Sequence, residues 1–413
     1  MTDKVKVSHK GGPIRGRIQL TGSKSISNRA LILNALSPTP QEIKNLSDSD
    51  DTQTLQRLLN QKEDNSIYDA HHAGTTFRFM TALLSVNKGE QIMTGSERMQ
   101  QRPIGPLVEA LNEIGANISY QNNEGYPPLK IGKFKTQEKK EISIRSDISS
   151  QFLSALCMIA PSLEEGLVIN LVGELVSKPY LEMTLEMMRS YGVKTSYEGT
   201  SIKIAPQPYK SLPYIVESDW SSASYLFEIA AIGEDVELEL EYFMESGLQA
   251  DATIMSFCNE LGVSAEFIGE QVLKLKSIKK YESNINHDFL SHPDLTQTIA
   301  VICAAKGIKI NYLGLKTLFI KETDRVAALS KELHKVGIKL VKAKDENYEY
   351  VQEGRVEIAE PIFNTYEDHR MAMCLAPLGY LSPVVIKNPS VVSKSYPNYW
   401  ADLEQLGFVL EWM

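Results

Sequence analysis

Residues 22–30 (GSKSISNRA) combine one lysine, three serines and one arginine within a single short segment. On a helix that begins here, Ser25 and Arg29 lie four residues apart on one face, beside Lys24 at the helix start. Hydroxyl, ammonium and guanidinium groups next to the N–H groups of a helix N-terminus are suited to phosphate or carboxylate. The nucleotide-hydrolase loop G-x-x-x-x-G-K-[ST] is not satisfied, because a serine separates the glycine from the lysine. The segment therefore predicts anion binding rather than nucleotide hydrolysis.

The same chemistry recurs at other predicted helix starts. Six stretches open with small, hydroxyl or charged residues, continue into mostly apolar runs, and begin near Ser25, Gly74, Ser149, Ser221, Asp294 and Asp368. The residues that an anion would contact at these starts are Lys24, Ser25, Ser149, Ser150 and Arg370. Simple N-capping explains Ser, Asp and Gly at any single start. The lysine and arginine that accompany several of them favour ligand binding.

A second, amphipathic helix pattern ends each time in a glycine that is followed by a strand-like run. Gly is favoured after a helix because it adopts the left-handed conformation without strain. The intervals are 77, 70, 75 and 70 residues, between Gly115, Gly192, Gly262, Gly337 and Gly407. Together with the six helix starts, this period predicts six copies of an α/β repeat with two helices and a small sheet, three per domain. The first repeat is shorter, because Ser25 and Gly74 are only 49 residues apart.

Bulk properties exclude several classes of protein. The chain has 413 residues, of which 43% are hydrophobic, and this length favours two domains. A net charge of −9 gives no global attraction to nucleic acid or acidic membranes. The sequence shows no signal peptide and no apolar run of about 18 residues, so a cytoplasmic protein is expected. The four cysteines are scattered singly, as expected of buried thiols in a reducing compartment.

The order of the charged segments resembles one family. Its segments are GSKSISNR at 22–29, AGTTFR at 73–78, RMQQRPI at 98–104, YPPL at 126–129, SSQFL at 149–153, VSKPY at 176–180, PD at 293–294, KETDR at 321–325, DHRMAM at 368–373 and SK at 393–394. This combination is similar to the 5-enolpyruvylshikimate-3-phosphate synthase family of enolpyruvyl transferases. The resemblance implies transfer of the carboxyvinyl group of phosphoenolpyruvate to the 5-hydroxyl of shikimate-3-phosphate, with release of phosphate, on the shikimate pathway to chorismate and aromatic amino acids.

The resemblance also implies a fold and a domain division. The fold would be an α/β (α+β) inside-out barrel of two domains, each built from three repeats. One enolpyruvyl-transferase domain would comprise residues 22–218, and the other residues 1–21 with 219–413. Neither a cofactor nor a metal is expected, and the protein would be a monomer whose partners are its small-molecule substrates, with no nucleic acid and no membrane. Membership would also make it a target of glyphosate.

The resemblance assigns substrate contacts motif by motif. Shikimate-3-phosphate would be bound by Lys24, Ser25, Arg29, Ser149, Ser150, Gln151, Ser177, Asp294 and Lys321. Phosphoenolpyruvate would be bound by Lys24, Gly74, Arg102, Gln151, Arg325, Arg370 and Lys394. Arg suits planar carboxylates because it donates two parallel hydrogen bonds, whereas Lys acts as a point charge on phosphate.

Proton transfer would fall to Asp294, Glu322 and Lys24. The 5-hydroxyl loses a proton as it attacks, and the methylene carbon of phosphoenolpyruvate gains one. We favour Asp294 as the base and Glu322 as the shuttle, although the division stays open at this stage. Asp294 could equally be an N-cap and Glu322 a surface ion-pair partner. His369 is expected to position other groups rather than to bind metal.

Four residues depart from the family pattern. They are His72 and Phe79, where Asn and Pro are expected, and Thr317 and Phe319, where Asn and Arg are expected. Two alternatives follow from such departures and from the shared fold. One is the sister enzyme that transfers the same group to a UDP-sugar in cell-wall synthesis, although residues 95–102 lack its reactive cysteine. The other is a non-catalytic anion-binding relative.

Overall fold

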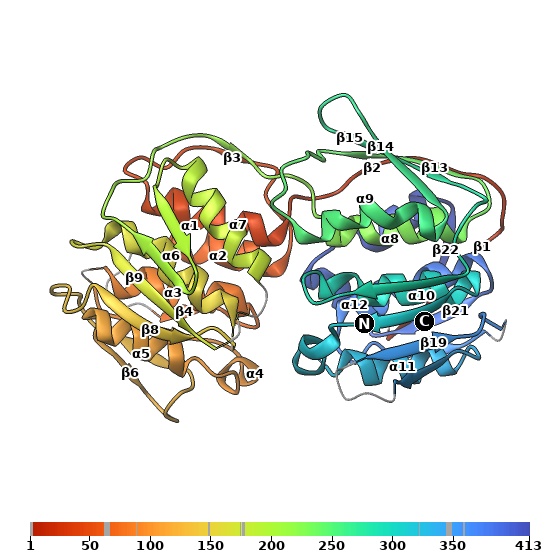
Figure 1. Ribbon diagram of the computed structural model, residues 1–413. Helices are drawn as coiled ribbons and strands as arrows, with labels where there is room; N and C mark the ends of the chain where they lie inside the picture. The colour runs from red at the N-terminus through yellow and green to blue at the C-terminus, as the bar shows by residue number, and fades with distance from the viewer. Residues whose placement is uncertain are drawn as a thin grey trace. The chain divides into compact units, whose positions relative to one another are not determined.

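The computed structural model describes residues 3–61, 67–87, 89–147, 149–173, 175, 178–321, 323–343, 349–357 and 360–413. The chain divides into two compact units (Figure 1). The first unit is Gly22–Val216, and the second combines Met1–Thr21 with Glu217–Met413.

The first unit contains three sheets among its described residues. Two are four-stranded, with orders β4-β5-β7-β6 and β8-β9-β11-β10, and one is the pair β3-β12. The strands are β3 (Ile43–Lys44), β4 (Ile67–Asp69), β5 (Gln91–Thr94), β6 (Ile118–Tyr120), β7 (Leu129–Ile131), β8 (Glu141–Arg145), β9 (Leu167–Val172), β10 (Thr195–Glu198), β11 (Ser201–Ile204) and β12 (Tyr214–Ile215). The helices are α1 (Lys24–Leu36), α2 (Asp50–Leu59), α3 (Gly74–Ser85), α4 (Glu97–Gln100), α5 (Gly105–Ile114), α6 (Ser150–Ile159) and α7 (Lys178–Ser190).

The described residues of the second unit repeat this plan with three four-stranded sheets, of orders β2-β13-β15-β14, β16-β17-β19-β18 and β20-β21-β1-β22. The strands are β1 (Lys4–His9), β2 (Ile14–Gln19), β13 (Val236–Glu241), β14 (Val263–Ile268), β15 (Val272–Ser277), β16 (Asn284–Asp288), β17 (Lys309–Leu313), β18 (Lys339–Lys342), β19 (Tyr350–Glu353), β20 (Ile362–Phe363), β21 (Val384–Lys387) and β22 (Phe408–Trp412). The helices are α8 (Trp220–Ile232), α9 (Ile254–Phe257), α10 (Thr296–Lys306), α11 (Arg325–His334), α12 (His369–Leu375) and α13 (Tyr399–Gln405).

All five four-stranded sheets share one topology. In each, the first two strands of the stated order are parallel and the remaining pairs are antiparallel. The pair β3-β12 is parallel, so the described part of the first repeat has the parallel pair without the antiparallel strands. The predicted six repeats, three per unit with the first one shortened, are confirmed.

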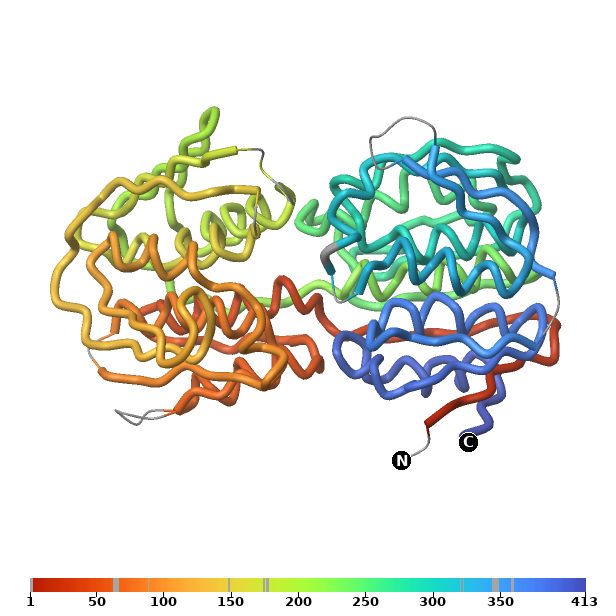
Figure 2. Tube along the Cα trace, turned by 90° about the horizontal axis from the view of Figure 1, so that it is seen from below, coloured from red at the N-terminus to blue at the C-terminus, as the bar shows by residue number. Residues whose placement is uncertain are grey.

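The N-terminal segment belongs to the second unit because its strands complete two sheets there. β2 pairs with β13 in parallel, and β1 lies between β21 and β22. This pairing brings the two ends of the chain side by side (Figure 2). Strand β13 shows why such sheets form, since its sequence VELELE alternates and buries Val236, Leu238 and Leu240 on one face.

The six helices that begin at the predicted anion sites are the inner helices of each unit. They are α1, α3 and α6 in the first unit and α8, α10 and α12 in the second. Most of their residues are buried, including polar ones such as Asn28, Arg29 and His369. The predicted starts are confirmed, although α10 begins at Thr296 after a 3₁₀ turn, η4 (Pro293–Leu295), which contains Asp294.

The glycines that follow the amphipathic helices also behave as predicted. Gly115, Gly192, Gly262, Gly337 and Gly407 all have positive φ. Before Gly262 the predicted continuous helix is replaced by the short α9 and a 3₁₀ turn, η3 (Cys258–Leu261).

Candidate active site

The second turn of α1 holds a buried arginine, Arg29, without a carboxylate partner among the described residues. Arg29 is 2% exposed and donates from Nε to Thr184 Oγ1 at 2.7 Å and from Nη2 to Ser154 Oγ at 3.1 Å. It also donates to the carbonyl oxygens of Ser25 and Tyr180. Burial lowers the pKa of Arg29 to about 10. A buried cation held only by neutral acceptors is costly, and an anionic ligand would offset that cost.

The N-termini of α1, α3 and α6 differ in how they are capped. Ser23 and Ala73, the N-caps of α1 and α3, form no side-chain cap hydrogen bond, whereas Ser149 accepts a hydrogen bond from the backbone N–H of Gln151. Simple capping therefore accounts for Ser149 but not for the residues at the start of α1. Gln151 also donates from Nε2 to Thr75 Oγ1 at 3.1 Å, which joins the first turns of α6 and α3. Ser150 is buried, and Lys24 and Ser25 are half-buried.

Two guanidinium groups lie beside Gly74 at the start of α3. A Cβ atom at Gly74 would clash with Arg102 and lie 2.8 Å from Nη1 of Arg78. Arg78 donates to the carbonyl oxygen of Gly74, and burial, together with the charge of Arg102, lowers its pKa to about 9 despite the opposing charge of Asp51. A larger residue here would therefore push both guanidinium groups away from the start of α3. Sequence reasoning missed Arg78, although it closes the AGTTFR segment four residues after Gly74.

In the second unit, the carboxylate of Asp294 lies between two arginines. Its Oδ1 accepts from Arg325 Nη1 at 2.8 Å, and its Oδ2 pairs with Arg370 Nη2 at 2.9 Å. Although burial alone would raise it, the charges of Arg370, Lys321 and Arg325 hold the pKa of Asp294 well below its usual range. The alternative that Asp294 is an N-cap fits poorly, because Leu295 is the N-cap of α10 and forms no side-chain cap hydrogen bond.

Asp368 orders both arginines of this cluster. Its Oδ2 accepts from Arg325 Nε at 2.7 Å, and its Oδ1 caps α12 by accepting the backbone N–H of Arg370 at 2.9 Å. The side chain of Asp368 is fully buried. His369 is also buried, with its Nδ1 3.8 Å from Asp368 Oδ1. These buried contacts fix the guanidinium group of Arg325 and the backbone of Arg370 in place.

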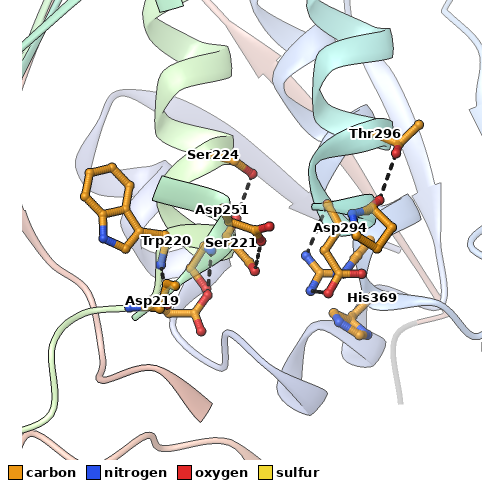
Figure 3. A network of polar contacts seen from close by, with 12 residues as sticks. Asp219, Trp220, Ser221, Ser224, Asp251, Asp294, Thr296 and His369 are labelled. Atoms are coloured by element: carbon orange, nitrogen blue, oxygen red, sulfur yellow. Dashed lines mark hydrogen bonds and ion pairs between the residues drawn. The ribbon is translucent and has the colours of Figure 1, made fainter. Parts of the chain in front are cut away.

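A second carboxyl group near this cluster is Asp251, which sequence reasoning missed. It lies on the 3₁₀ turn η2 (Ala250–Thr253) and accepts a hydrogen bond from Ser221 Oγ at the start of α8 (Figure 3). Burial and the neighbouring charge of Asp294 raise the pKa of Asp251 to about 7, opposed by Arg370 and by the Ser221 hydrogen bond. No local motif marks Asp251, because its environment is created by the packing of η2 against α8.

The predicted site residues are distributed over both units. The first unit contains Lys24, Ser25, Arg29, Gly74, Arg102, Ser149, Ser150 and Gln151, and the second contains Asp294, Lys321, Arg325, Arg370 and Lys394. Lys321 is half-buried, and Lys394, also half-buried, donates to the carbonyl oxygen of Glu367 at 2.7 Å. Ser177 and Glu322 lie outside the described residues, so their predicted roles remain predictions.

The structure shows the contacts of the four residues that depart from the family pattern. His72 contacts Ser96 Oγ through Nδ1 at 2.8 Å, and Phe79 lies 5.5 Å from the guanidinium carbon of Arg29, a cation–π distance. Thr317 is buried and its hydroxyl has no hydrogen-bond partner among the described residues. Phe319 packs against Tyr350 with ring centroids 6.4 Å apart.

Other classes of site were also sought among the described residues. No group of three or more His, Cys, Asp or Glu side chains there is arranged to bind a metal ion. Within the same ranges, every helix is too short or too polar to cross a membrane. All four cysteines are buried free thiols.

Comparison with known proteins places this arrangement in a family. The profile of EPSP synthase (3-phosphoshikimate 1-carboxyvinyltransferase) matches residues 8–62 and 56–403. A 3-phosphoshikimate 1-carboxyvinyltransferase from Bacteroides fragilis is 45% identical over 397 residues, covering 96% of each chain. One from a Sulfurovum species is 37% identical, covering 95% of this chain and 97% of that protein. A solved EPSP synthase from Acinetobacter baumannii has a TM-score of 0.82 at 19% identity, covering 99% of this chain and 100% of that one, so the fold is shared. The chain therefore belongs to the EPSP synthase family.

Proposed function

We propose that the protein transfers the carboxyvinyl group of phosphoenolpyruvate to the 5-hydroxyl of shikimate-3-phosphate and releases phosphate. The observation that supports this most strongly is the 45% identity, over 96% of both chains, to a 3-phosphoshikimate 1-carboxyvinyltransferase. The buried or closely packed guanidinium groups of Arg29, Arg78, Arg325 and Arg370 add a physical reason. Both substrates bear a phosphate and a carboxylate, and such groups need fixed cations in a protein of net charge −9.

For shikimate-3-phosphate, we assign the carboxylate to Ser25 and Arg29. The phosphate is assigned to Ser149, Ser150, Ser177 and Lys321, with Lys24 nearby and Gln151 against the ring. The assignment of Arg29 is supported by its burial among neutral acceptors, which leaves its positive charge uncompensated by any described carboxylate.

For phosphoenolpyruvate, we assign the carboxylate to Arg102, Arg325 and Arg370 and the phosphate to Lys24 and Lys394. Gly74 allows close approach of the ligand to the backbone. Gln151 lies near Gly74, because it donates a hydrogen bond to Thr75, the next residue of α3. Arg78 joins this set, because it borders both Gly74 and Arg102.

The reaction needs proton transfer and no change of oxidation state. The 5-oxygen of the acceptor bonds to the central carbon of phosphoenolpyruvate while its proton passes to a base, and the methylene carbon receives a proton. The resulting tetrahedral adduct then expels phosphate as a proton leaves the new methyl group, which restores the double bond. We assign the base to Asp294 and the shuttle at the methylene carbon to Glu322, with Lys24 as the third proton-transfer group.

The two units would act as the two enolpyruvyl-transferase domains, residues 22–218 and residues 1–21 with 219–413. We further propose that the enzyme works in the cytoplasm as a monomer without a cofactor. The absence of cysteine from residues 95–102 disfavours the UDP-sugar transferase.

A phosphate-release assay with phosphoenolpyruvate and shikimate-3-phosphate tests the function. Turnover should require both substrates, and omission of either should stop it. A UDP-sugar acceptor in place of shikimate-3-phosphate should give no release. Release only with the UDP-sugar would establish the sister activity, and no release with either acceptor would establish a non-catalytic anion-binding relative.

A further inference from the structure

The carboxylate of Asp294 is paired with Arg325 and Arg370. These are two of the arginines that the proposed function assigns to the carboxylate of phosphoenolpyruvate. The two carboxylate oxygens of Asp294 lie 2.8 Å from Arg325 Nη1 and 2.9 Å from Arg370 Nη2. Each oxygen thus has its own guanidinium, and charge-assisted contacts of this kind are also those that a substrate carboxylate would make. Asp294 therefore resembles a substrate carboxylate that is built into the protein.

This arrangement conflicts with the role of Asp294 as a base. A general base works best when its pKa lies near the working pH. The two arginines and Lys321 hold the pKa of Asp294 well below its usual range, so in this state the carboxylate accepts a proton poorly. Asp294 is 9% exposed, and it would become a stronger base if it stayed buried but lost a positive neighbour.

The charged and titratable groups around Asp294 and its two arginines come from several elements. They are Lys321 after the 3₁₀ turn η5 (Leu315–Ile320), Arg325 of α11, Asp368, His369 and Arg370 at the start of α12, Tyr225 of α8, and Asp251 of η2. Arg325 has a second carboxylate in Asp368, at 2.7 Å from Nε, and so stays paired if Asp294 leaves. Arg370 pairs through Nη2 with Asp294, and its Nη1 lies 3.5 Å from both Tyr225 Oη and the backbone carbonyl oxygen of Asp294. Because Arg325 keeps Asp368 in either state, an incoming carboxylate that displaces Asp294 would take over Arg370.

We propose that the carboxylate of phosphoenolpyruvate displaces Asp294 from Arg370, so that Asp294 becomes an effective base only once that substrate is bound. The inference rests on the proposed function. It adds a second role to Asp294, whose carboxylate competes with that of the substrate for the guanidinium group of Arg370. No bond is made or broken in this step, since one carboxylate replaces another on the same guanidinium.

This exchange of one carboxylate for another on Arg370 predicts an unusual result for the variant Asp294→Asn. A residue that only supports the site should weaken ligand binding when it is changed, whereas removal of a competing carboxylate should strengthen it. We expect phosphoenolpyruvate alone, titrated calorimetrically at pH 7, to bind the variant about tenfold or more tighter than the parent, because a charge-assisted contact no longer has to be broken. Equal or weaker binding by the folded variant would overturn the proposal.

A matched control removes one negative charge without touching an arginine of the cluster. Asp324 is exposed and caps α11 through the N–H of Ala327 at 2.9 Å. Asp324→Asn should keep this cap, since Asn and Asp are comparable N-caps, and should leave phosphoenolpyruvate affinity within about twofold of the parent. A tenfold gain in this control as well would assign the effect to net charge and contradict exchange.

A second measurement works on the parent and stands even if Asp294→Asn fails to fold. When Asp294 loses Arg370, its pKa rises, so binding should be accompanied by proton uptake, beyond the exchange due to the ligand's own phosphate, that grows as the pH is lowered toward the pKa of the released carboxylate. Calorimetry in buffers of different ionisation enthalpy measures this uptake. Asp251 also faces Arg370, so Asp251→Asn must retain the uptake. Parent uptake that vanishes in Asp251→Asn, or that is absent throughout, would refute exchange.

The two levels of inference fail differently. If the parent releases phosphate when both substrates are present, but either the tighter binding by Asp294→Asn or the proton uptake is missing, the function holds and the exchange is wrong. If the parent shows no turnover with shikimate-3-phosphate, the proposed function is wrong at its root.

Discussion

Arg29 Nε lies 2.7 Å from Thr184 Oγ1, which joins the second turn of α1 to α7 through a buried cation and a neutral hydroxyl. Thr184 Oγ1 also lies 2.8 Å from both Ser154 Oγ and the carbonyl oxygen of Tyr180, so its hydroxyl keeps partners if the arginine is removed. The contact therefore positions Arg29 without compensating its charge. Such an arrangement favours a ligand over the stability of the free protein.

The variant Arg29→Met tests whether Arg29 serves ligand binding at the expense of the stability of the free protein. Because Met fills similar space without a buried charge, we expect a melting temperature no lower than that of the parent. Affinity for shikimate-3-phosphate should fall by about a hundredfold or more, since charge-assisted hydrogen bonds are lost. Exposed Arg57 of α2 supplies the control, because Arg57→Met should change neither quantity. A melting temperature more than about 5 °C lower, with ligand affinity retained, would mean that Arg29 is a structural residue.

Arg102→Ala should separate the two substrates. Arg102 is exposed and lies beside Gly74, where the proposed function places the phosphoenolpyruvate carboxylate. Loss of its hydrogen bonds, worth about 1.5–3 kcal/mol each, should raise the dissociation constant of phosphoenolpyruvate far more than that of shikimate-3-phosphate. Separate titrations of the two ligands measure both. Equal weakening would show that the assignment of Arg102 to phosphoenolpyruvate is wrong.

Gly74→Ala should damage the same site by steric means. The added methyl group would meet the guanidinium groups of Arg102 and Arg78, which must then move. We expect KM for phosphoenolpyruvate to rise at least about tenfold with little change in melting temperature, because φ at Gly74 is helical and alanine favours helices. Gly105→Ala is the matched control, because Gly105 also begins a helix, α5, and a Cβ atom there would make only ordinary contacts, the nearest at 3.5 Å, so KM should stay unchanged. An unchanged KM in Gly74→Ala would indicate that the arginines are free to shift.

The elements were predictable where local chemistry decides them. The starts of α1, α3 and α6 follow from small and hydroxyl residues before apolar runs, and the ends of the amphipathic helices follow from glycines with positive φ. The contacts of Arg78 and Asp251 could not be predicted, because they depend on residues far apart in sequence, such as Arg102 and Ser221. Asp294 illustrates the difference. Its place near a helix start was predicted, but its pairing with two arginines is a product of tertiary packing.

Asp294→Asn should also reduce turnover. Asn can still accept a hydrogen bond from Arg325, but it cannot take up the proton of the 5-hydroxyl. We expect turnover to fall by about 10²–10⁴-fold while the affinity for shikimate-3-phosphate stays nearly intact. Steady-state phosphate release and a titration of shikimate-3-phosphate measure the two effects. Turnover within a few-fold of the parent would move the base to Glu322 or Lys24.

Glu228 gives the second unit a pH dependence that is independent of the site. It lies on α8 with 0% exposure, and both carboxyl oxygens lack hydrogen-bond partners among the described residues. Burial raises its pKa well above the usual range. In the unfolded chain the group has its ordinary pKa near 4.5, so above that pH the folded unit binds more protons than the unfolded one. Stability must therefore fall as pH rises from 4.5 toward the folded-state pKa, by up to about 1.4 kcal/mol per pH unit.

Glu228→Gln removes this titration while keeping the shape of the side chain. Its melting temperature should match that of the parent near pH 4.5 and exceed it increasingly toward pH 8, because the parent alone must keep a buried proton or bury a charge. Exposed Glu234, just beyond the same helix, is the matched control, since Glu234→Gln should follow the parent at every pH. Differential scanning calorimetry of the three proteins across this range measures the separation. Parallel curves for the parent and Glu228→Gln would mean that the Glu228 carboxyl finds a compensating partner in solution and titrates normally.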